Sequence, residues 1–263
     1  LDRNNSRYFC LGKRKSNLLS YINKLHKLLA REKYDVIHVN GNSATMLFEL
    51  VIAKMCNVQK RIAHGHSAQT SYPMLNNILK KVFNRTLTTA IAVSSQTGDW
   101  LYGENNYVVL KNAIDLDKYR FSNKIRMKTR ERFNVNDKYV IGTVGKLNCS
   151  KNHEFLIEIF KEIYDRNQNT HLLIVGGGEL EQTLKEKVRA LDLNDAVTMP
   201  GMQLNVSEFL QAMDVFVFPS KSEGFGLSLV EAQASGLQCV ASDNVPKETR
   251  VSDFVEYLNL ESS

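Results

Sequence analysis

The sequence has few cysteines and no long hydrophobic run. Its 263 residues include four cysteines, far apart and outside any CxxC or Cys/His cluster: Cys10, Cys56, Cys149 and Cys239. This spacing argues against a disulfide framework or a zinc site and is typical of a reducing cytoplasm. No stretch approaches the ~18 consecutive apolar residues of a membrane span, and no secretory signal pattern occurs. We therefore expect a cytoplasmic globular protein.

Acidic residues are outnumbered, but the excess of positive charge is dispersed. The chain has 34 Lys and Arg against 28 Asp and Glu, a net charge of +6. Basic runs such as Lys80–Lys81 and the cations of segment 124–130 are not interleaved with the aromatic side chains that stack on bases. We therefore expect no nucleic-acid partner. The charge fits solvated faces, an anionic membrane surface or an anionic substrate.

The second half of the chain alternates short apolar runs with helical patterns. Five apolar runs predict strands, at residues 139–145, 171–176, 196–199, 215–218 and 237–241. Periodic apolar positions predict helices between them, including segments 155–163, 180–191 and 227–235. Buried strands alternating with helices are typical of a doubly wound parallel α/β sheet covered on both faces.

The first half repeats this alternation less regularly. Strands are predicted at 36–39, 61–64, 90–93 and 107–110, and helices at 18–29, 44–55 and 74–85. Ser16 is placed to cap the first of these helices. Between Asp115 and Asp137 the periodicity stops and charges dominate. We therefore place a domain boundary near Ser122, with an N-terminal domain of residues 1–122 and a C-terminal domain of residues 123–263.

Polar residues and glycines follow the predicted strands of the second half. Lys146 and Lys151 come after the first strand, glycines 176–178 after the second, and Glu223 and Glu231 after the fourth. Ligands of open parallel sheets bind beyond the carboxyl ends of strands and at helix N-termini. Lysines and backbone amides suit phosphates, whereas carboxylates suit hydroxyls. Each feature alone is typical of a surface residue or a turn; together they predict a ligand with a diphosphate.

The glycine turn does not favour a nicotinamide cofactor. It lacks the GxGxxG spacing, and no acidic residue follows it at the offset of a first βαβ unit. The sequence EGFGLSLVE at 223–231 instead resembles the E-x7-E motif of the retaining GT-B glycosyltransferases of glycosyltransferase family 4. Segments 144–151, 174–179 and 110–115 resemble the V-G-R-L…K, V-G-x-G and P-N-G-V/I-D patterns of that family. Segment 151–160 resembles most the bacterial enzymes of capsular and exopolysaccharide synthesis.

The resemblance implies a GT-B fold, with two Rossmann-like doubly wound domains facing a cleft. It implies catalytic roles for Lys146 and Lys151, which would neutralise the diphosphate of the leaving group. Glu223 would face the donor sugar. The family keeps a histidine after a first-domain strand; His64 matches it better, and His66 is the rival.

The resemblance also implies a donor-binding set of glycine turns and strand ends: Gly145, Gly177, Met199, Gly224, Phe225, Gly226 and Glu231. Within it, Glu231 would bind the ribose hydroxyls, and a turn at 199–202 would meet the base. No metal and no other cofactor is expected, because the D-x-D pair Asp115 and Asp117 lies in a charged loop where such acids are usually solvated or cap the backbone.

Several positions depart from the family pattern. Lys146 replaces an arginine, so a point charge replaces a bidentate fork. The glycine-rich loop that follows the first strand of the family and its closing helices have no counterpart. We therefore expect an incomplete copy of a longer protein, with a partial N-terminal domain.

The resemblance implies a glycosyltransferase that moves a sugar with retention from a nucleotide-sugar donor, UDP-sugar favoured, to a glycan or lipid-linked acceptor in surface polysaccharide synthesis. A nucleotide-sugar epimerase or phosphorylase on the same fold, or a non-catalytic nucleotide-sugar binder, is the alternative. The predicted helix at 74–85 carries Met74, Ile78 and Val82 beside Lys80 and Lys81. Such a face either packs on the sheet or rests on anionic lipid at the inner face of the cell membrane.

Overall fold

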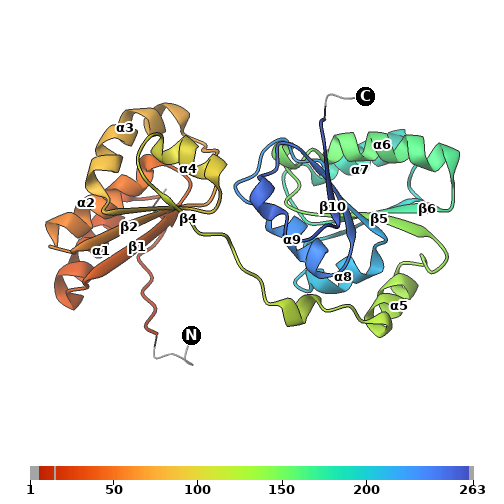
Figure 1. Cartoon of the computed structure of the whole chain (residues 1–263), viewed down its shortest axis with the longest axis horizontal. Coiled ribbons are helices and arrows are strands. Elements are labelled where there is room, and N and C mark those ends of the chain that lie inside the picture. The colour runs from red at the N-terminus through yellow and green to blue at the C-terminus, as the bar shows by residue number, and fades with distance from the viewer. Residues whose placement is uncertain (1–5, 15, 261–263) are drawn as a thin grey trace. The chain divides into compact units, whose positions relative to one another are not determined.

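The chain forms two compact units, each built on its own parallel sheet (Figure 1). The structure is a computed structural model that describes residues 6–14 and 16–260. The units are Leu1–Leu110 and Lys111–Ser263. This is the two-domain, Rossmann-like α/β architecture that the alternation of strands and helices predicts.

The first unit has a four-stranded parallel sheet in the order β1-β2-β3-β4. Its strands are β1 (Val36–Gly41), β2 (Lys60–Gly65), β3 (Thr89–Ala92) and β4 (Val108–Val109). Its helices are α1 (Leu18–Glu32), η2 (Ala44–Met46), α2 (Leu47–Met55), α3 (Pro73–Thr86) and α4 (Ser95–Tyr102). Small residues on the strands let the helices approach closely: Leu50, Phe83 and Leu101 pack in one cluster with Ala63 and Ala92.

The opposite face of this sheet carries polar side chains. Side chains alternate between the faces of a strand, and register partners in a parallel pair share a face. His38 pairs with Ile62 and Asn40 with His64, so these four positions lie on one face. Ala63, between two of them, packs among the helices. The sheet therefore presents histidines on the face away from that cluster.

Asn17, rather than the predicted Ser16, caps α1. The Asn17 side chain accepts a hydrogen bond from the Ser20 N–H at 2.9 Å. Ser16 lies one residue too early, in a turn where its own N–H bonds to the Lys13 carbonyl. The cap is the residue directly before the first helical residue, and Asn is as good a cap as Ser.

The second unit has a six-stranded parallel sheet in the order β10-β9-β8-β5-β6-β7. Its strands are β5 (Tyr139–Val144), β6 (Thr170–Val175), β7 (Val197–Gly201), β8 (Val215–Phe218), β9 (Gln238–Ser242) and β10 (Val255–Leu258). β10 is additional to the five strands predicted. The order reverses at β5, because β6 and β7 lie on one side of it and β8 on the other, so the sheet is doubly wound.

Helices cover both faces of this sheet (Figure 1). They are α5 (Asn123–Arg132), α6 (His153–Arg166), α7 (Glu181–Ala190), α8 (Val206–Ala212) and α9 (Leu227–Ala234), with short turns η3 (Leu116–Tyr119), η4 (Cys149–Lys151) and η5 (Lys247–Thr249). Leu156 of α6 and Leu184 of α7 belong to one buried cluster, and Phe209 of α8 and Leu229 of α9 belong to another. The two clusters are the cores on the two faces.

Residues 111–122 pack with the second unit, so the structure divides the chain earlier than the predicted boundary near Ser122. The Ser122 N–H donates to Gln211 Oε1 of α8 at 2.7 Å, and the Tyr119 hydroxyl bonds to Glu231 of α9. These polar contacts join residues about 90 or more positions apart in sequence. The loss of periodicity after Asp115 therefore predicted an irregular segment correctly, but it did not indicate that residues 111–122 belong to the second unit.

The helix α5 was not expected, because charged residues dominate it. Long-range ion pairs hold it: Arg126 and Arg130 both bind the Asp214 carboxylate, the latter at 3.1 Å. Burial alone would raise the pKa of Asp214, but the Val140 N–H and the two arginines outweigh burial and lower it. Asp214 is therefore the ionised anchor that ties α5 to the start of β5.

Candidate functional site

The reversal of strand order brings two loops of the second unit together. β5 and β8 are neighbours, and the segments after them, 145–151 and 219–226, leave the same edge of the sheet. The Lys221 N–H donates to the Ser150 carbonyl at 2.8 Å and joins the two loops. Ligands of doubly wound sheets bind at this position. Lys146, Lys151 and Glu223, predicted from the sequence, all lie in these loops.

Lys151 and Glu223 form a largely buried ion pair. Lys151 Nζ lies 2.5 Å from Glu223 Oε1, and their side chains are 17% and 9% exposed. The Lys151 ammonium also lies 4.7 Å from the centroid of the Phe218 ring, at the end of β8, where the ring attracts a cation. The Asn148 side chain accepts a bond from the Lys151 N–H at 3.2 Å and so fixes the turn η4. Glu223 and Phe218 thus hold the ammonium, and Asn148 fixes the backbone that carries it.

Lys146 occupies a more open position. Its Nζ lies 3.2 Å from Glu179 Oε2, and the two side chains are 63% and 58% exposed. The backbone N–H of Glu179 and then the Lys146 ammonium lower the pKa of the Glu179 carboxyl. Lys146 is therefore a solvated cation with a solvated partner, free to turn toward an incoming anion.

The glycine turn after β6 lies against the loop after β5. A Cβ at Gly176 would lie 1.8 Å from the Gly145 carbonyl oxygen, and one at Gly178 would lie 2.3 Å from that of Leu147. Only glycine allows this approach of backbone to backbone. The glycines thus serve the contact between the loops, and the loops then line a cavity of about 350 Å³.

Met202, the last residue of the predicted 199–202 turn, lines this cavity together with Gly145, Lys146 and Gly177. Gln203, which the sequence reasoning missed, lines it as well. The predicted Met199 lies inside β7 instead of in a turn, and its side chain packs against the buried cluster of Ile141 and Leu172. The strand continues to Gly201 and places the next two side chains at its carboxyl end. The sequence signal that could have identified Gln203 is its position shortly after the end of a predicted strand, where ligands of parallel sheets bind.

Glu231 lies in the second turn of α9, apart from the Lys151–Glu223 pair. Gly226, with φ +91°, is the N-cap of α9 and adopts the left-handed conformation that favours glycine. Phe225 is 4% exposed, so its ring belongs to the core and only its backbone is available to a ligand. Tyr119 Oη donates to Glu231 Oε1 at 2.6 Å. Burial raises the pKa of Glu231, and the bond from Tyr119 opposes that shift.

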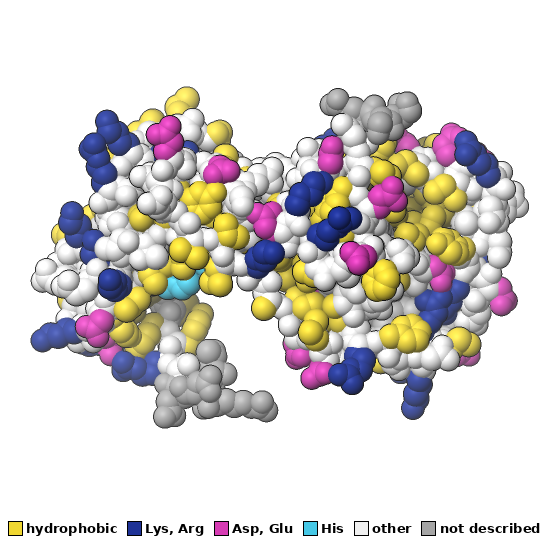
Figure 2. Space-filling view, viewed as in Figure 1, with side chains coloured by type: hydrophobic (Ala, Val, Ile, Leu, Met, Phe, Trp, Pro, Cys, Tyr) yellow, Lys and Arg dark blue, Asp and Glu magenta, His cyan; other side chains and the backbone are white. Residues whose placement is uncertain are grey.

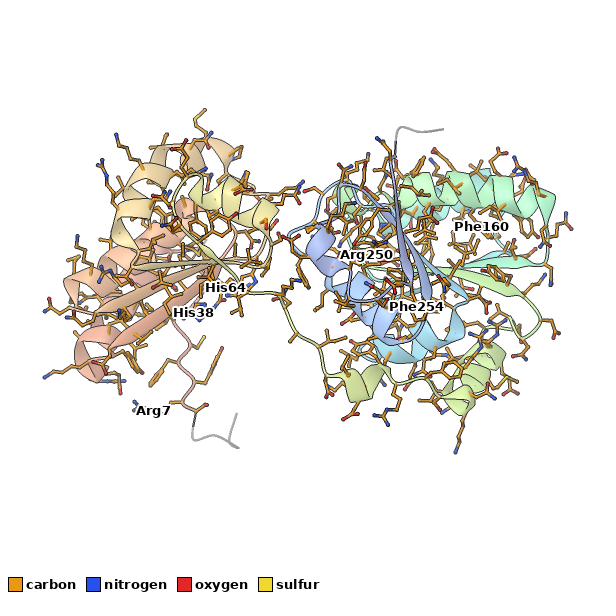
Figure 3. The ribbon with its side chains drawn as sticks, in the orientation of Figure 1. Arg7, His38, His64, Phe160, Arg250 and Phe254 are labelled. Carbon is orange, nitrogen blue, oxygen red and sulfur yellow. The ribbon has the colours of Figure 1, made fainter. Side chains whose placement is uncertain are left out.

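His38 of β1 and His64 of β2 stack on each other (Figure 3), and the ring of His66, just after β2, lies tilted against that of His64. His64 Nδ1 lies 3.3 Å from His38 Nε2, whereas His66 Nε2 lies 2.8 Å from Asn40 Oδ1. Burial, together with His66 and His38, lowers the pKa of His64 to about 4, so its ring is neutral at pH 7. His64 is 6% exposed, and its Nε2 has no hydrogen-bond partner within residues 6–14 and 16–260. In the described residues, the Nε2 of His64 therefore has no hydrogen-bond partner, whereas the Nε2 of His66 is bonded to Asn40.

Asp115 of the D-x-D pair caps the backbone, as predicted. Asp115 Oδ1 accepts a bond from the Asp117 N–H at 3.2 Å and caps η3. In the described part of the chain, no group of three or more His, Cys, Asp or Glu side chains is placed to hold a metal ion.

The helix α3 divides its apolar residues between two faces. Phe83 is fully buried in the first unit, but Met74, Ile78 and Val82 are 77%, 67% and 51% exposed. Figure 2 shows hydrophobic and basic side chains at the surface of this unit. Lys80 Nζ donates to the Trp100 carbonyl at 2.7 Å and so holds α4. The predicted core packing thus applies to only one face of the helix.

Comparison with known families accounts for most of the chain. Residues 125–253 match the family described as "Glycosyl transferases group 1", and residues 2–118 match "Glycosyltransferase Family 4". The two matches meet between residues 118 and 125, a stretch that includes the boundary predicted near Ser122, whereas the structural division follows Leu110. No described helix is long and apolar enough to cross a membrane.

Two curated relatives extend over most of this chain. "Putative glycosyltransferase EpsF" of Bacillus subtilis is 27% identical over 89% of this chain and 64% of its own length. The "UDP-Gal:alpha-D-GlcNAc-diphosphoundecaprenol alpha-1,3-galactosyltransferase" of Escherichia coli is 29% identical over 83% of this chain and 60% of its own length. The chain thus spans less than two thirds of either relative.

A solved structure shares the fold. HepE of Anabaena, determined in complex with UDP-glucose, matches 95% of this chain and 71% of its own with a TM-score of 0.81 and 20% identity. Family matches over both units, relatives along most of the sequence and this fold agree. The chain belongs to the GT-B glycosyltransferases of the family 4 type.

Proposed function

We propose that the second unit binds a nucleotide-sugar donor and that the protein transfers the sugar, with retention, to a glycan or lipid-linked acceptor in surface polysaccharide synthesis. The observation that carries the proposal is the set of charged groups in the loops at the carboxyl edge of β5, β6 and β8: Lys146 lines a cavity of about 350 Å³, and Lys151 and Glu223 form an ion pair in the loops after β5 and β8. Because the chain spans only part of its relatives, the activity belongs to the whole protein.

The donor we favour is a UDP-sugar. The Escherichia coli relative is named for UDP-galactose, and the HepE structure holds UDP-glucose. The cavity lined by Gly177, Met202 and Gln203 offers backbone and apolar surface for a planar base. Glu231 would accept hydrogen bonds from the ribose, and the amides of segment 224–226 would meet the sugar and phosphate at the start of α9.

The cations supply the proposed electrostatic catalysis. As the bond from the sugar to the diphosphate breaks, negative charge grows on the leaving diphosphate, and Lys146 and Lys151 stabilise it. Lys151 must then exchange part of its contact with Glu223 for a phosphate oxygen, which frees the Glu223 carboxylate for sugar hydroxyls. We assign a catalytic contact to His64 of the first unit as well, because its ring is neutral and its Nε2 has no hydrogen-bond partner within the described residues.

A screen of UDP-, GDP- and ADP-sugars by thermal unfolding tests the donor. A ligand at 100 Kd stabilises the folded state by about 2.7 kcal/mol. We expect UDP and UDP-sugars to raise the unfolding temperature and GDP- and ADP-sugars to raise it less. Equal shifts for all three bases would contradict the assignment of UDP.

The products distinguish this proposal from the other enzymes of the same fold. With donor and a lipid-linked acceptor present, we expect sugar on the acceptor and free nucleoside diphosphate. An epimerase would instead return an altered nucleotide-sugar, and a phosphorylase would form a sugar phosphate. Donor binding with none of these products would identify a non-catalytic binder.

We also propose that the outer face of α3 rests on an anionic lipid surface, which places the protein at the inner face of the cell membrane. Met74, Ile78 and Val82 form an exposed apolar stripe, and Lys81 and Arg85 are exposed beside it. An apolar stripe with a basic flank complements the acyl boundary and the anionic headgroups. Each cation near the surface adds about 1 kcal/mol, which salt screens.

Co-sedimentation with vesicles of increasing anionic lipid content tests this surface. The charge reversal Lys81→Glu/Arg85→Glu should abolish binding at low salt. The matched control Lys124→Glu/Lys128→Glu makes the same change of charge on exposed residues of α5 and should leave binding in place. If both variants lost vesicle binding equally, the effect would be explained by net charge alone. If the Lys81→Glu/Arg85→Glu variant still bound, α3 would not be the membrane-binding surface.

A further inference from the structure

A single hydrogen bond joins the segment that follows the unit boundary to the ribose-binding glutamate proposed above. Tyr119 ends η3, nine residues after the division at Leu110, and its hydroxyl donates to Glu231 Oε1 at 2.6 Å. The two residues are 112 positions apart in sequence. η3 and α9 also contact each other along their backbones, so the bond belongs to a packed junction.

The Tyr119 side chain is well fixed. It packs against the buried cluster that includes Phe209 and Leu229, and the Asp115 cap holds the turn from which it projects. Burial raises the pKa of the Tyr119 phenol, and the carboxylates of Glu231 and Asp115 raise it further. The hydroxyl therefore keeps its proton at neutral pH and acts as a hydrogen-bond donor to Glu231.

The bond engages only one oxygen of the carboxylate. Glu231 Oε2 has no hydrogen-bond partner among the residues that the structure describes. A carboxylate with one oxygen held has a restricted orientation, and its second oxygen can accept from a hydroxyl of a ligand. A hydrogen bond to the charged form also favours that form, so the same bond keeps Glu231 an acceptor.

We propose that Tyr119 is a positioning residue of the nucleotide site: its hydroxyl holds Glu231 Oε1, so that Oε2 accepts hydrogen bonds from the ribose of the donor. The proposal rests on the proposed function of Glu231. It assigns to η3, near the start of the second unit, a direct part in nucleotide affinity, because any displacement of η3 would release the carboxylate.

Calorimetric titration with three ligands tests the proposal: UDP, 2′,3′-dideoxy-UDP and inorganic pyrophosphate. Tyr119→Phe keeps the ring and removes the hydroxyl. We expect it to weaken UDP binding about tenfold, within the range for a hydrogen bond to a charged group. Affinity for the other two ligands should stay unchanged, since neither has the ribose hydroxyls. Tyr257→Phe is the matched control, because Tyr257 packs on the same cluster but bonds to Thr249.

The double variant separates positioning from packing. In a Glu231→Gln background, Tyr119→Phe should have no further effect on UDP, because the two residues act through one interaction. The pH dependence adds a second readout. Because the bond lowers the pKa of Glu231, its removal should shift the acid limb of UDP binding to higher pH. A residue that only packs would not move this limb.

The possible failures are distinguishable. If the wild-type chain binds neither UDP nor pyrophosphate, the proposed function falls and the role of Tyr119 with it. If the wild type binds UDP and Tyr119→Phe binds it equally well, only the role of Tyr119 is wrong. Equal weakening of UDP and dideoxy-UDP would likewise assign Tyr119 to packing. If Tyr119→Phe fails to fold, Glu231→Gln alone must still show a loss confined to UDP, and its absence overturns the proposal.

Discussion

Two lysines five residues apart in one loop carry the same charge in very different surroundings. Lys151 is 17% exposed, lies over the Phe218 ring and pairs with the buried Glu223. Lys146 is 63% exposed and pairs with the exposed Glu179. A buried pair is strongly coupled to the fold, whereas an exposed pair contributes little to it. We infer that Lys151 sets the shape of the site before the ligand arrives and that Lys146 responds to the ligand.

The largest expected effect comes from breaking the buried pair. Lys151→Gln leaves the Glu223 carboxylate buried without its cation, which should lower the free energy of unfolding by about 3 kcal/mol. Lys146→Gln, the matched control, should change it by less than about 0.5 kcal/mol. Urea unfolding of both variants measures the difference. If both variants had the same free energy of unfolding, the proposed difference between Lys151 and Lys146 would be wrong.

The two glutamates sharpen the comparison at the level of binding. Glu231→Ala should weaken UDP and UDP-sugar alike, by about 2 kcal/mol, because both ligands carry the ribose. Glu223→Ala should leave UDP affinity unreduced and weaken only the sugar-bearing donor, since Lys151 then becomes fully available to phosphate. Calorimetric titration of both ligands decides. A Glu223→Ala variant that loses both ligands equally would contradict its assignment to the sugar.

The smallest effect is expected for the exposed lysine. Lys146→Gln should weaken UDP binding by about 1.5 kcal/mol, the lower end for a hydrogen bond to a charged group. Lys146→Arg should retain most of the affinity, because the charge and the donors remain. Titration at low and high salt provides the control, since the contribution of an exposed charge decreases with ionic strength. If Lys146→Gln bound UDP as tightly as the wild type, Lys146 would be an ordinary solvated surface lysine with no role in binding.

The sequence predicted the elements whose signal is local. The strand at 215–218 coincides with β8, and the helix predicted at 74–85 lies within α3 (Pro73–Thr86), because apolar periodicity records burial directly. Helix α5 was missed because its stability comes from Arg126 and Arg130 on Asp214, a residue more than 80 positions away. No local pattern carries that information.

The candidate site shows the same limit. The order of motifs placed Lys146, Lys151 and Glu223 at the correct edge of the sheet, because strand ends are visible in the sequence. The pairing of Lys151 with Glu223 across 72 residues, and of Tyr119 with Glu231 across 112, depends on packing of distant segments. Met202 replaced Met199 at the cavity because β7 runs to Gly201, beyond the end that its apolar run indicated.

The most direct test of the account is amide hydrogen exchange of the chain with and without UDP. The account places the ligand at the carboxyl edge of β5, β6 and β8. We therefore expect slower exchange in segments 145–151, 176–179 and 222–231, and unchanged exchange at Asp243 and Asn244, which line a larger groove. Protection confined to that groove, or no protection at saturating UDP, would contradict the central claim.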